Sequence, residues 1–153
     1  AGSISGIQLR GLPKAYSTVY IDGVKVSDNS TPKNDYYFDD MIVFSIHPDG
    51  KTHWKNVLHK KQYSQSDIAV FSSYFLLKTP SSLRFIFNDE IKLENTVSEY
   101  VVKGSGEFER NSILSTDDQR IQLRFAEALQ VGASEFVVPS IIRTKMKLIR
   151  VKY

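Results

Sequence analysis

Three histidines recur every six residues, at His47, His53 and His59, and histidine is a common zinc ligand. On one regular strand this even spacing would place the three imidazoles on the same face, as a metal site requires. Two of them lie at turns, however, and the nearby acids do not complete a ligand set. We therefore expect neither a metal ion nor another cofactor.

Paired carboxylates are the next candidates for chemistry, and they occur at Asp39-Asp40, Asp89-Glu90 and Asp117-Asp118. A glycosidase needs two carboxyl groups held about 5 to 10 Å apart. These three pairs lie in different predicted loops, and neighbouring acids at a strand end point apart. The chain has no Cys, which excludes thiol nucleophiles, Cys-bound zinc and disulfides. No Ser-His-Asp motif, phosphate loop or calcium loop occurs, so we expect a protein that is not an enzyme.

Polar, aromatic and basic side chains remain as candidate contacts for a partner or ligand. The candidates are Trp54, Gln62, Tyr63, Asp67, Tyr74, Lys145, Lys147, Arg150 and Lys152. The polar members, together with Lys60 and Asn88, either line a ligand site or hydrogen-bond backbone groups where loops pack. We favour the second interpretation, because buried backbone groups must be satisfied. Most of the aromatic residues are expected in the core, with an exposed subset able to stack on sugars or to anchor a protein.

The formal charge of +3 is distributed unevenly. Residues 1–140 contain 15 Lys and Arg against 17 Asp and Glu, which gives −2, whereas the last thirteen residues carry five basic side chains and no acid. Such a stripe can bind phosphate or anionic lipid, but it is more often the solvated face of an edge strand. Nucleic-acid binding is disfavoured because the rest of the chain is slightly acidic.

Composition predicts the elements that must position these residues. Only six residues are Ala, against 26 Val and Ile, eight Tyr and nine Phe. Branched and aromatic side chains favour strands over helices. We therefore expect an all-β protein.

Strands are expected over residues 41–46, 54–58, 68–77, 83–87, 99–103 and 108–114. This strand pattern repeats with a period of about 55 residues, as propeller blades do. We expect an N-terminal hairpin region at 1–35 and two antiparallel four-stranded, blade-like units at 36–95 and 96–153. Two units cannot close a ring, so the fold would be an incomplete propeller or part of a larger one. Its open edges would be completed by other protein subunits or by further blades.

Four local expectations accompany this plan. Asp22-Gly23 predicts a hairpin between residues 19–21 and 24–26. The nearly continuous apolar run of residues 41–46 predicts a strand buried on both faces. Residues 119–131 fit either an amphipathic helix or a strand, and the repeat favours the strand. A bulge between Leu148 and Ile149 would place all apolar side chains of the last strand on one face and its cations on the other.

Residues 36–153 also resemble the C-terminal part of a family of large β-propeller-like envelope proteins of Bacteroidota. The resemblance rests on the order of four stretches: 40–43 leading to Asp49-Gly50 and Trp54; 60–67; 73–74 leading to 83–89; and 106–110 closing on 147–151. It implies a location in the periplasm or at the outer membrane, and partners in outer-membrane machinery such as type IX secretion. It implies no catalytic residues.

These observations predict a non-catalytic, protein-binding scaffold or plug-like accessory subunit of a bacterial envelope complex. The alternative is a carbohydrate-binding module or a glycan-processing envelope protein. A concave site with an exposed Trp or Tyr and convergent acids would favour the glycan alternative. A broad, uncharged contact patch would favour assembly.

Overall fold

The computed structural model of the 153-residue chain describes residues 6–7, 18–19, 24–27, 34–65, 69–89, 96–115, 122–142 and 145–153. This part of the chain consists of antiparallel strands and one short 3-10 helix, which confirms the all-β class. The elements are β1 (Gly6–Ile7), β2 (Thr18–Val19), β3 (Val24–Ser27), β4 (Asn34–Phe38), β5 (Met41–Ile46), β6 (Thr52–Leu58), β7 (Gln62–Gln65), β8 (Phe75–Lys78), β9 (Ser82–Asn88), β10 (Thr96–Lys103), β11 (Phe108–Ser115), β12 (Gln122–Leu123), η1 (Phe125–Glu127), β13 (Leu129–Gly132), β14 (Glu135–Ile142) and β15 (Lys145–Lys152).

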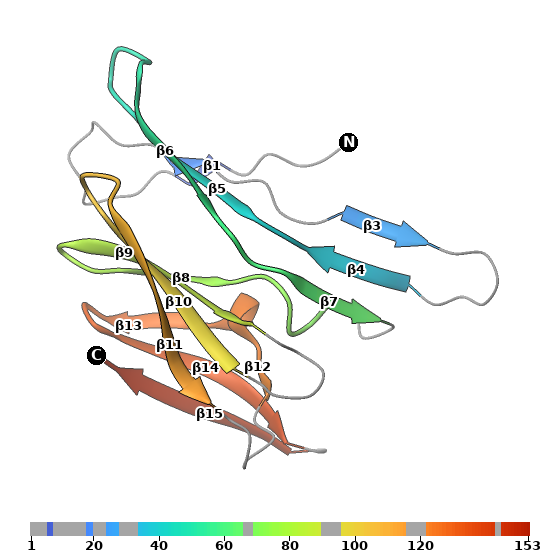
Figure 1. The fold of residues 1–153 in the computed structure, drawn as a ribbon. Coiled ribbons are helices and arrows are strands. Elements are labelled where there is room, and N and C mark those ends of the chain that lie inside the picture. The colour runs from blue at the N-terminus through green and yellow to red at the C-terminus, as the bar shows by residue number, and fades with distance from the viewer. Residues whose placement is uncertain are drawn as a thin grey trace.

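Apart from the two-stranded pair β1-β2, the described strands form three layers, one above another in Figure 1. Layer I consists of β3 to β7, in which β5 pairs with β6, and β4 pairs with both β3 and β7. Layer II is the meander β8-β9-β10-β11. In layer III, β14 pairs with β15 on one side and with β12 and β13 on the other.

Layer II lies between the other two layers and is covered on both faces. Phe85 and Phe87 point into one core, which they share with Met41, Val43 and Leu58 of layer I. The intervening Ile86 points into a second core, where the largest side chains of layer III are Phe125 and Phe136. This position explains why β9 and β10 are rich in apolar residues on both faces.

Pro139 determines where the neighbour of β14 is interrupted. Its carbonyl oxygen accepts a bond from Arg124 N–H at 2.9 Å, so its polar groups face the side of β12 and β13. Proline has no N–H to donate, and at this point the neighbouring strand gives way to η1. The strand expected over 119–131 is therefore present as two pieces, β12 and β13, on either side of a single 3-10 turn.

The pairing does not follow the two expected units. The division between residues 95 and 96 falls inside layer II, because β9 and β10 are hydrogen-bonded neighbours across it. Strands joined by a short connection commonly pair, and here that preference links the two segments. The described residues form no closed ring, so the assignment of the layers as propeller blades stays a prediction.

Three local expectations need correction. The turn Asp22-Gly23 lies outside the described residues, but β2 pairs with β1, and β3 pairs with β4 in the three-stranded sheet β3-β4-β7. The strand expected from residue 68 begins only at Phe75, after positive φ angles at Ala69 and Ser73. In β5, burial alternates along the strand, with full burial on one face only.

The last strand has a regular register, and the predicted bulge is wrong. Val138 pairs with Ile149 and Pro139 pairs with Leu148, with no shift between them. Because side chains alternate between the faces of a strand, Ile149 and Val151 point toward layer II. Leu148, by the same alternation, points away from the core, and so do its strand neighbours of even number.

Candidate functional site

A buried amine and amide begin a polar network between the layers. Lys60 Nζ donates to the carbonyl oxygen of Phe38 at 2.9 Å and to Gln62 Oε1 at 3.2 Å. Gln62 Oε1 also accepts the backbone N–H of Ser73 at 2.9 Å. Both side chains are buried, so these bonds satisfy groups that have little access to water.

Asn88 continues this network into layers II and III. Gln62 Nε2 donates to the carbonyl oxygen of Asn88 at 2.6 Å. The side-chain nitrogen of Asn88 donates to the carbonyl oxygens of Phe71 at 2.9 Å and Leu123 at 2.7 Å. Lys60, Gln62 and Asn88 therefore bind backbone groups where the layers and their loops pack, as the favoured interpretation expected.

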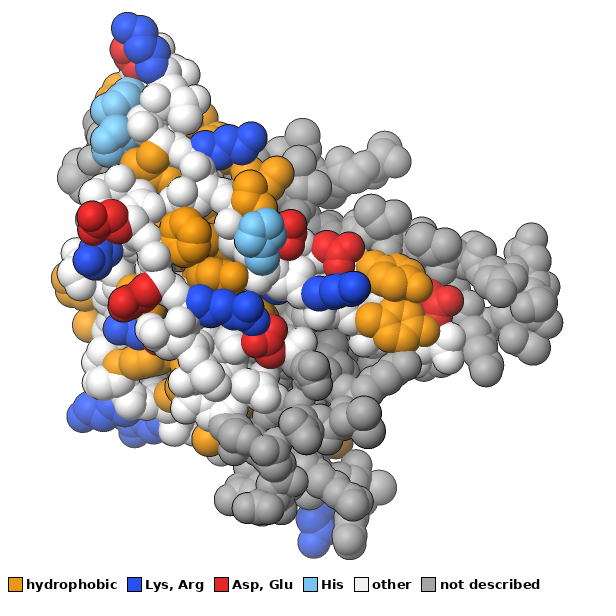
Figure 2. All heavy atoms as spheres, in the orientation of Figure 1, with side chains coloured by type: hydrophobic (Ala, Val, Ile, Leu, Met, Phe, Trp, Pro, Cys, Tyr) orange, Lys and Arg blue, Asp and Glu red, His pale blue; other side chains and the backbone are white. Residues whose placement is uncertain are grey.

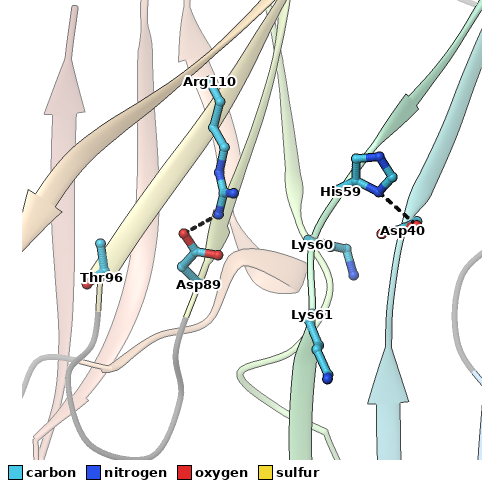
Figure 3. A pocket seen from close by; sticks show the side chains of 7 residues that line it. All are labelled: Asp40, His59, Lys60, Lys61, Asp89, Thr96 and Arg110. Carbon is cyan, nitrogen blue, oxygen red and sulfur yellow. Dashed lines mark hydrogen bonds and ion pairs between the residues drawn. The ribbon is translucent and has the colours of Figure 1, made fainter.

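Beside this network, a charged hollow of about 590 Å³ opens between layers I and II (Figure 3). It is lined by Asp40, His59, Lys60, Lys61, Asp89, Thr96 and Arg110. Tyr100 supports its wall from the core side by donating its hydroxyl hydrogen to the carbonyl oxygen of His59 at 2.7 Å. Burial raises the pKa of this phenol, which keeps it a neutral hydrogen-bond donor.

Each carboxylate of the hollow is already held by a cation or an imidazole. Asp40 Oδ2 lies 3.0 Å from His59 Nδ1, and Asp89 Oδ2 lies 2.5 Å from a guanidinium nitrogen of Arg110. Asp89 also accepts the hydroxyl of Ser98 at 2.6 Å. On the face drawn in Figure 2, several other acidic and basic side chains also lie next to one another. The hollow therefore offers paired charges for contact, and its two acids are not arranged as a free acid–base pair.

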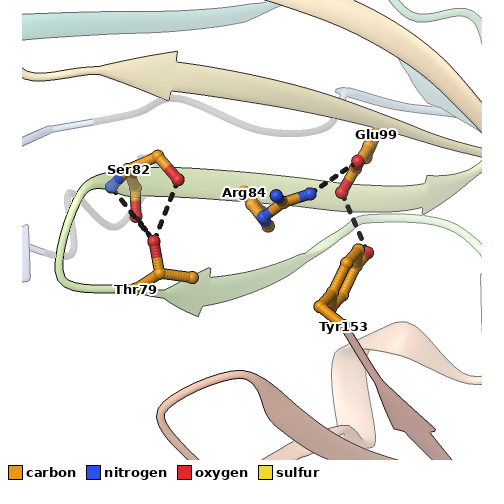
Figure 4. A network of polar contacts seen from close by, with 5 residues as sticks. All are labelled: Thr79, Ser82, Arg84, Glu99 and Tyr153. Atoms are coloured by element: carbon orange, nitrogen blue, oxygen red, sulfur yellow. Dashed lines mark hydrogen bonds and ion pairs between the residues drawn. The ribbon is translucent and has the colours of Figure 1, made fainter.

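A second polar cluster joins layers II and III at the end of the chain (Figure 4). The buried Glu99 accepts a bond from Arg84 at 2.7 Å and another from the hydroxyl of Tyr153 at 2.9 Å. The guanidinium of Arg84 lies 4.3 Å from the centre of the Tyr153 ring. Burial, reinforced by the bond to Glu99, raises the pKa of Tyr153 above its ordinary value. This cluster was not predicted from the sequence, although single charged residues inside the apolar strands β9 and β10 were a signal that partners must exist.

The outward side of layer III exposes large apolar side chains. Leu129 and Val131 of β13 are 67% and 49% exposed, and Met146 and Leu148 of β15 are 61% and 70% exposed. We call these four residues the outer apolar face. Apolar patches on a protein surface commonly mark contact sites.

The four predicted cations of β15 do not form one stripe. Arg150 and Lys152 lie on the outward side and both contact Glu135, at 2.5 Å and 3.5 Å. The bond from Arg150 lowers the pKa of Glu135 and keeps this carboxylate ionised. Lys145 and Lys147 belong to the opposite row of side chains and are exposed. The regular register of β15 is the reason for this division.

The predicted aromatic contacts are mostly structural. The indole of Trp54 packs on the first core and donates to the carbonyl oxygen of Gly104 at 3.0 Å. Tyr74 is a core residue, and Tyr63 donates its hydroxyl to Asp35 at 3.0 Å. Asp67 lies outside the described residues. Gln62 belongs to the polar network, and Trp54 and Tyr63 are half-buried. Among the predicted contacts that the structure describes, the cations of β15 are therefore the most exposed.

The histidines do not converge on one point. The rings of His47 and His53 lie 4.6 Å apart beside the β5–β6 turn, whereas His59 pairs with Asp40 in the hollow. Within the described part of the chain, no group of three possible metal ligands lies together.

Comparison of the chain with known protein families, curated proteins and solved structures gives no match. The resemblance to envelope proteins of Bacteroidota, together with the location it implies, therefore stays a prediction. Across the described residues, none of the helices has the length and apolar character needed to cross a bilayer.

Proposed function

We propose that the chain is a non-catalytic scaffold that binds another protein subunit through the outer apolar face of layer III. The observation that carries this proposal is the exposure of Leu129, Val131, Met146 and Leu148 on one side of a sheet. Each of the two layer interfaces inside the molecule buries side chains of this type. A further protein layer on the outward side would remove the same kind of apolar surface from water.

The two acids of the charged hollow are already bonded, which speaks against acid–base catalysis there. Asp40 is hydrogen-bonded to His59 and Asp89 forms an ion pair with Arg110, so neither carboxylate is free to act with a second one. The indole of Trp54, which a sugar-binding site would use as a platform, is hydrogen-bonded to Gly104 and packed on the core. The assembly proposal therefore has more support than the glycan alternative. The setting in a bacterial envelope complex rests on the sequence resemblance alone.

The test compares two Glu substitutions at exposed apolar positions. Leu129→Glu places a charge in the outer apolar face, and Val57→Glu places one on β6 of layer I, where Val57 is 38% exposed. The wild-type chain and both variants are immobilised, extracts of the native source are applied, and retained proteins are quantified by mass spectrometry. The strongest retained protein is then purified and its affinity for each of the three chains is measured.

Loss of binding by Leu129→Glu, with full binding by wild type and Val57→Glu, supports the proposal. Equal binding by all three chains would contradict it, because the contact would then lie elsewhere. Retention of polysaccharide in place of protein would favour the glycan alternative.

A further inference from the structure

One side of the stack formed by layers II and III is closed by a single side chain. The side-chain oxygen of Gln130 on β13 accepts the backbone N–H of Lys78 at 3.2 Å, and its nitrogen donates to the Lys78 carbonyl oxygen at 2.7 Å. This amide therefore pairs with the edge strand β8 as a neighbouring strand would. At this side of the stack, β13 of layer III and the edge strand β8 of layer II are therefore joined.

The opposite side of the same stack is open. It is formed by β11 and β15, which are the outermost strands of their sheets. Between them lies a cavity of about 320 Å³. The cavity is lined by Ile86, Val97, Ile113, Leu114, Leu123, Phe125, Phe136, Arg150, Val151, Lys152 and Tyr153. Its interior is apolar, and the two cations among its lining residues belong to the edge strand β15.

Alternate residues of β15 direct their backbone N–H and C=O groups toward its free edge. Because the Pro139 carbonyl oxygen faces β12, Pro139 and its partner Leu148 form a pair without mutual hydrogen bonds. The N–H and C=O of Leu148 therefore point away from β14, and in a regular strand those of Arg150 do the same. The bond from Tyr153 N–H to the carbonyl oxygen of Ser134 at 3.0 Å agrees with this order, since odd-numbered residues then face β14.

The charge of this edge indicates what can pair with it. β15 carries Lys145, Lys147, Arg150 and Lys152, and only Glu135 on the neighbouring strand offsets them. A second copy of β15 would bring like charges side by side, which opposes pairing. An acidic strand would meet complementary charge.

We infer that the edge of β15 accepts an extended segment of another protein in which apolar and acidic residues alternate. The segment adds to β15 as a strand, using the free backbone groups of Leu148 and Arg150. Its side chains beside Ile149 and Val151 face inward and fill the cavity, and its acidic side chains lie beside Arg150 and Lys152. The inference rests on the proposed function and specifies the form of the partner that the scaffold recognises.

The test uses two synthetic peptides of the same length, one alternating Val and Glu and the other alternating Val and Lys. Binding to the full chain is measured by fluorescence anisotropy, and hydrogen exchange is measured at each amide of β15. The Val/Glu peptide is expected to bind, with affinity falling as salt is added, and to protect the amides of Leu148 and Arg150. Equal binding of both peptides, or binding without protection of these two amides, would overturn the inference.

Two substitutions at one position separate the backbone from the side chain. Leu148→Pro removes the outward N–H and leaves the pairing with β14 intact, whereas Leu148→Ala removes only the side chain. We expect Leu148→Pro to bind the Val/Glu peptide about tenfold more weakly than Leu148→Ala. Equal affinity of the two variants would contradict strand addition. If Leu148→Pro does not fold, the protection pattern of the wild-type chain still decides the question.

Failure of this inference can be distinguished from failure of the proposed function. Leu129 lies on β13, away from the β15 edge, so Leu129→Glu tests the outer apolar face alone. If Leu129→Glu abolishes binding of the native partner while Leu148→Pro and Leu148→Ala bind it equally, the scaffold proposal stands and strand addition is overturned. Concentration-dependent dimers in sedimentation, broken by Leu148→Pro, would overturn the acidic partner in favour of a second copy.

Discussion

Gly106 lies directly against the indole of Trp54, so that a Cβ atom at this position would fall 2.6 Å from Trp54 Cγ. Trp54 belongs to β6 of layer I, and Gly106 belongs to the turn between β10 and β11 of layer II. Asn56, also on β6, donates to the Gly106 carbonyl oxygen at 2.5 Å. The two layers therefore meet at a position where only glycine fits.

Gly106→Ala is expected to lower the free energy of unfolding by about 2–5 kcal/mol, because it adds a clash to an unfavourable φ of +90°. Gly50→Ala is the matched control, since Gly50 has a φ of +86° but no atom within 4 Å of an added Cβ. Gly50→Ala should lower the free energy of unfolding by about 1 kcal/mol. Urea denaturation of both variants measures the difference, and equal losses would show that Trp54 does not limit this position.

Asn88→Ala should destabilise the protein by about 2–4 kcal/mol, because it removes the donor to two backbone carbonyl oxygens, one in a buried bond and one in a partly buried bond. These oxygens belong to Phe71, in the loop that precedes β8, and to Leu123 of β12. The substitution therefore removes the bonds that join β9 to this loop and to layer III. Asn88→Asp keeps the volume of the side chain but also removes both donors, and it should be at least as destabilising. A near-normal denaturation midpoint for Asn88→Asp would contradict the hydrogen-bond assignment.

Arg84→Met should cost about 3–5 kcal/mol, since it leaves the charge of the buried Glu99 without its ion-pair partner. The pair of Lys51 with Asp49 is exposed to solvent and provides a comparison. Lys51→Ala should change stability by less than about 0.5 kcal/mol. Thermal and urea unfolding of the two variants will show whether burial determines how much an ion pair contributes to stability.

Stability should fall at high pH through Tyr153. Burial and the bond to Glu99 raise the pKa of Tyr153 in the folded state above its ordinary value of about 10. The folded protein therefore holds the phenol proton more tightly than the unfolded chain does. This contribution is complete below about pH 10 and is lost as the pH rises from there through the folded pKa.

Tyr153→Phe is the variant that isolates this effect. It should be about 1–2 kcal/mol less stable at neutral pH, because Glu99 loses one hydrogen-bond donor. Its stability should then decline less steeply than that of the wild type between pH 9 and pH 12. Parallel curves for the two proteins would assign the alkaline decline to other groups.

The strands themselves were largely predictable, because local patterns specify them. Apolar and branched residues between Gly- and Asp-containing turns marked β5, β6, β9, β10 and β11 within a few residues of their observed ends. The sheets were not predictable in this way. The pairing of β9 with β10 depends on which segments lie side by side, and the repeat pattern assigned these two strands to different units.

The register of β15 was mispredicted for a related reason. A bulge would have placed Met146 and Leu148 in the core, which is the preferred location of such side chains in an isolated subunit. The structure retains a regular strand and leaves both residues exposed. Met146 and Leu148, which were expected in the core, belong instead to the outer apolar face that we propose as the contact with a partner.

Part of the candidate site could be foreseen from the sequence. The polar stretch containing Lys60 and Gln62 was expected to bind backbone groups, and both side chains do so. The bond between Asp89 and Arg110 and the bond between Glu99 and Tyr153 join residues 21 and 54 positions apart. Contacts at such separations follow from the packing of the layers and have no local signal.

Hydrogen exchange along β15 of the isolated chain tests the open stack most directly. The amides of Ile149 and Val151 face β14 and should exchange slowly, whereas those of Leu148 and Arg150 face the free edge and should exchange rapidly. This alternation is the result we predict. Slow exchange at all four amides in the isolated chain would mean that the edge is already covered, and it would contradict a scaffold completed by its partner.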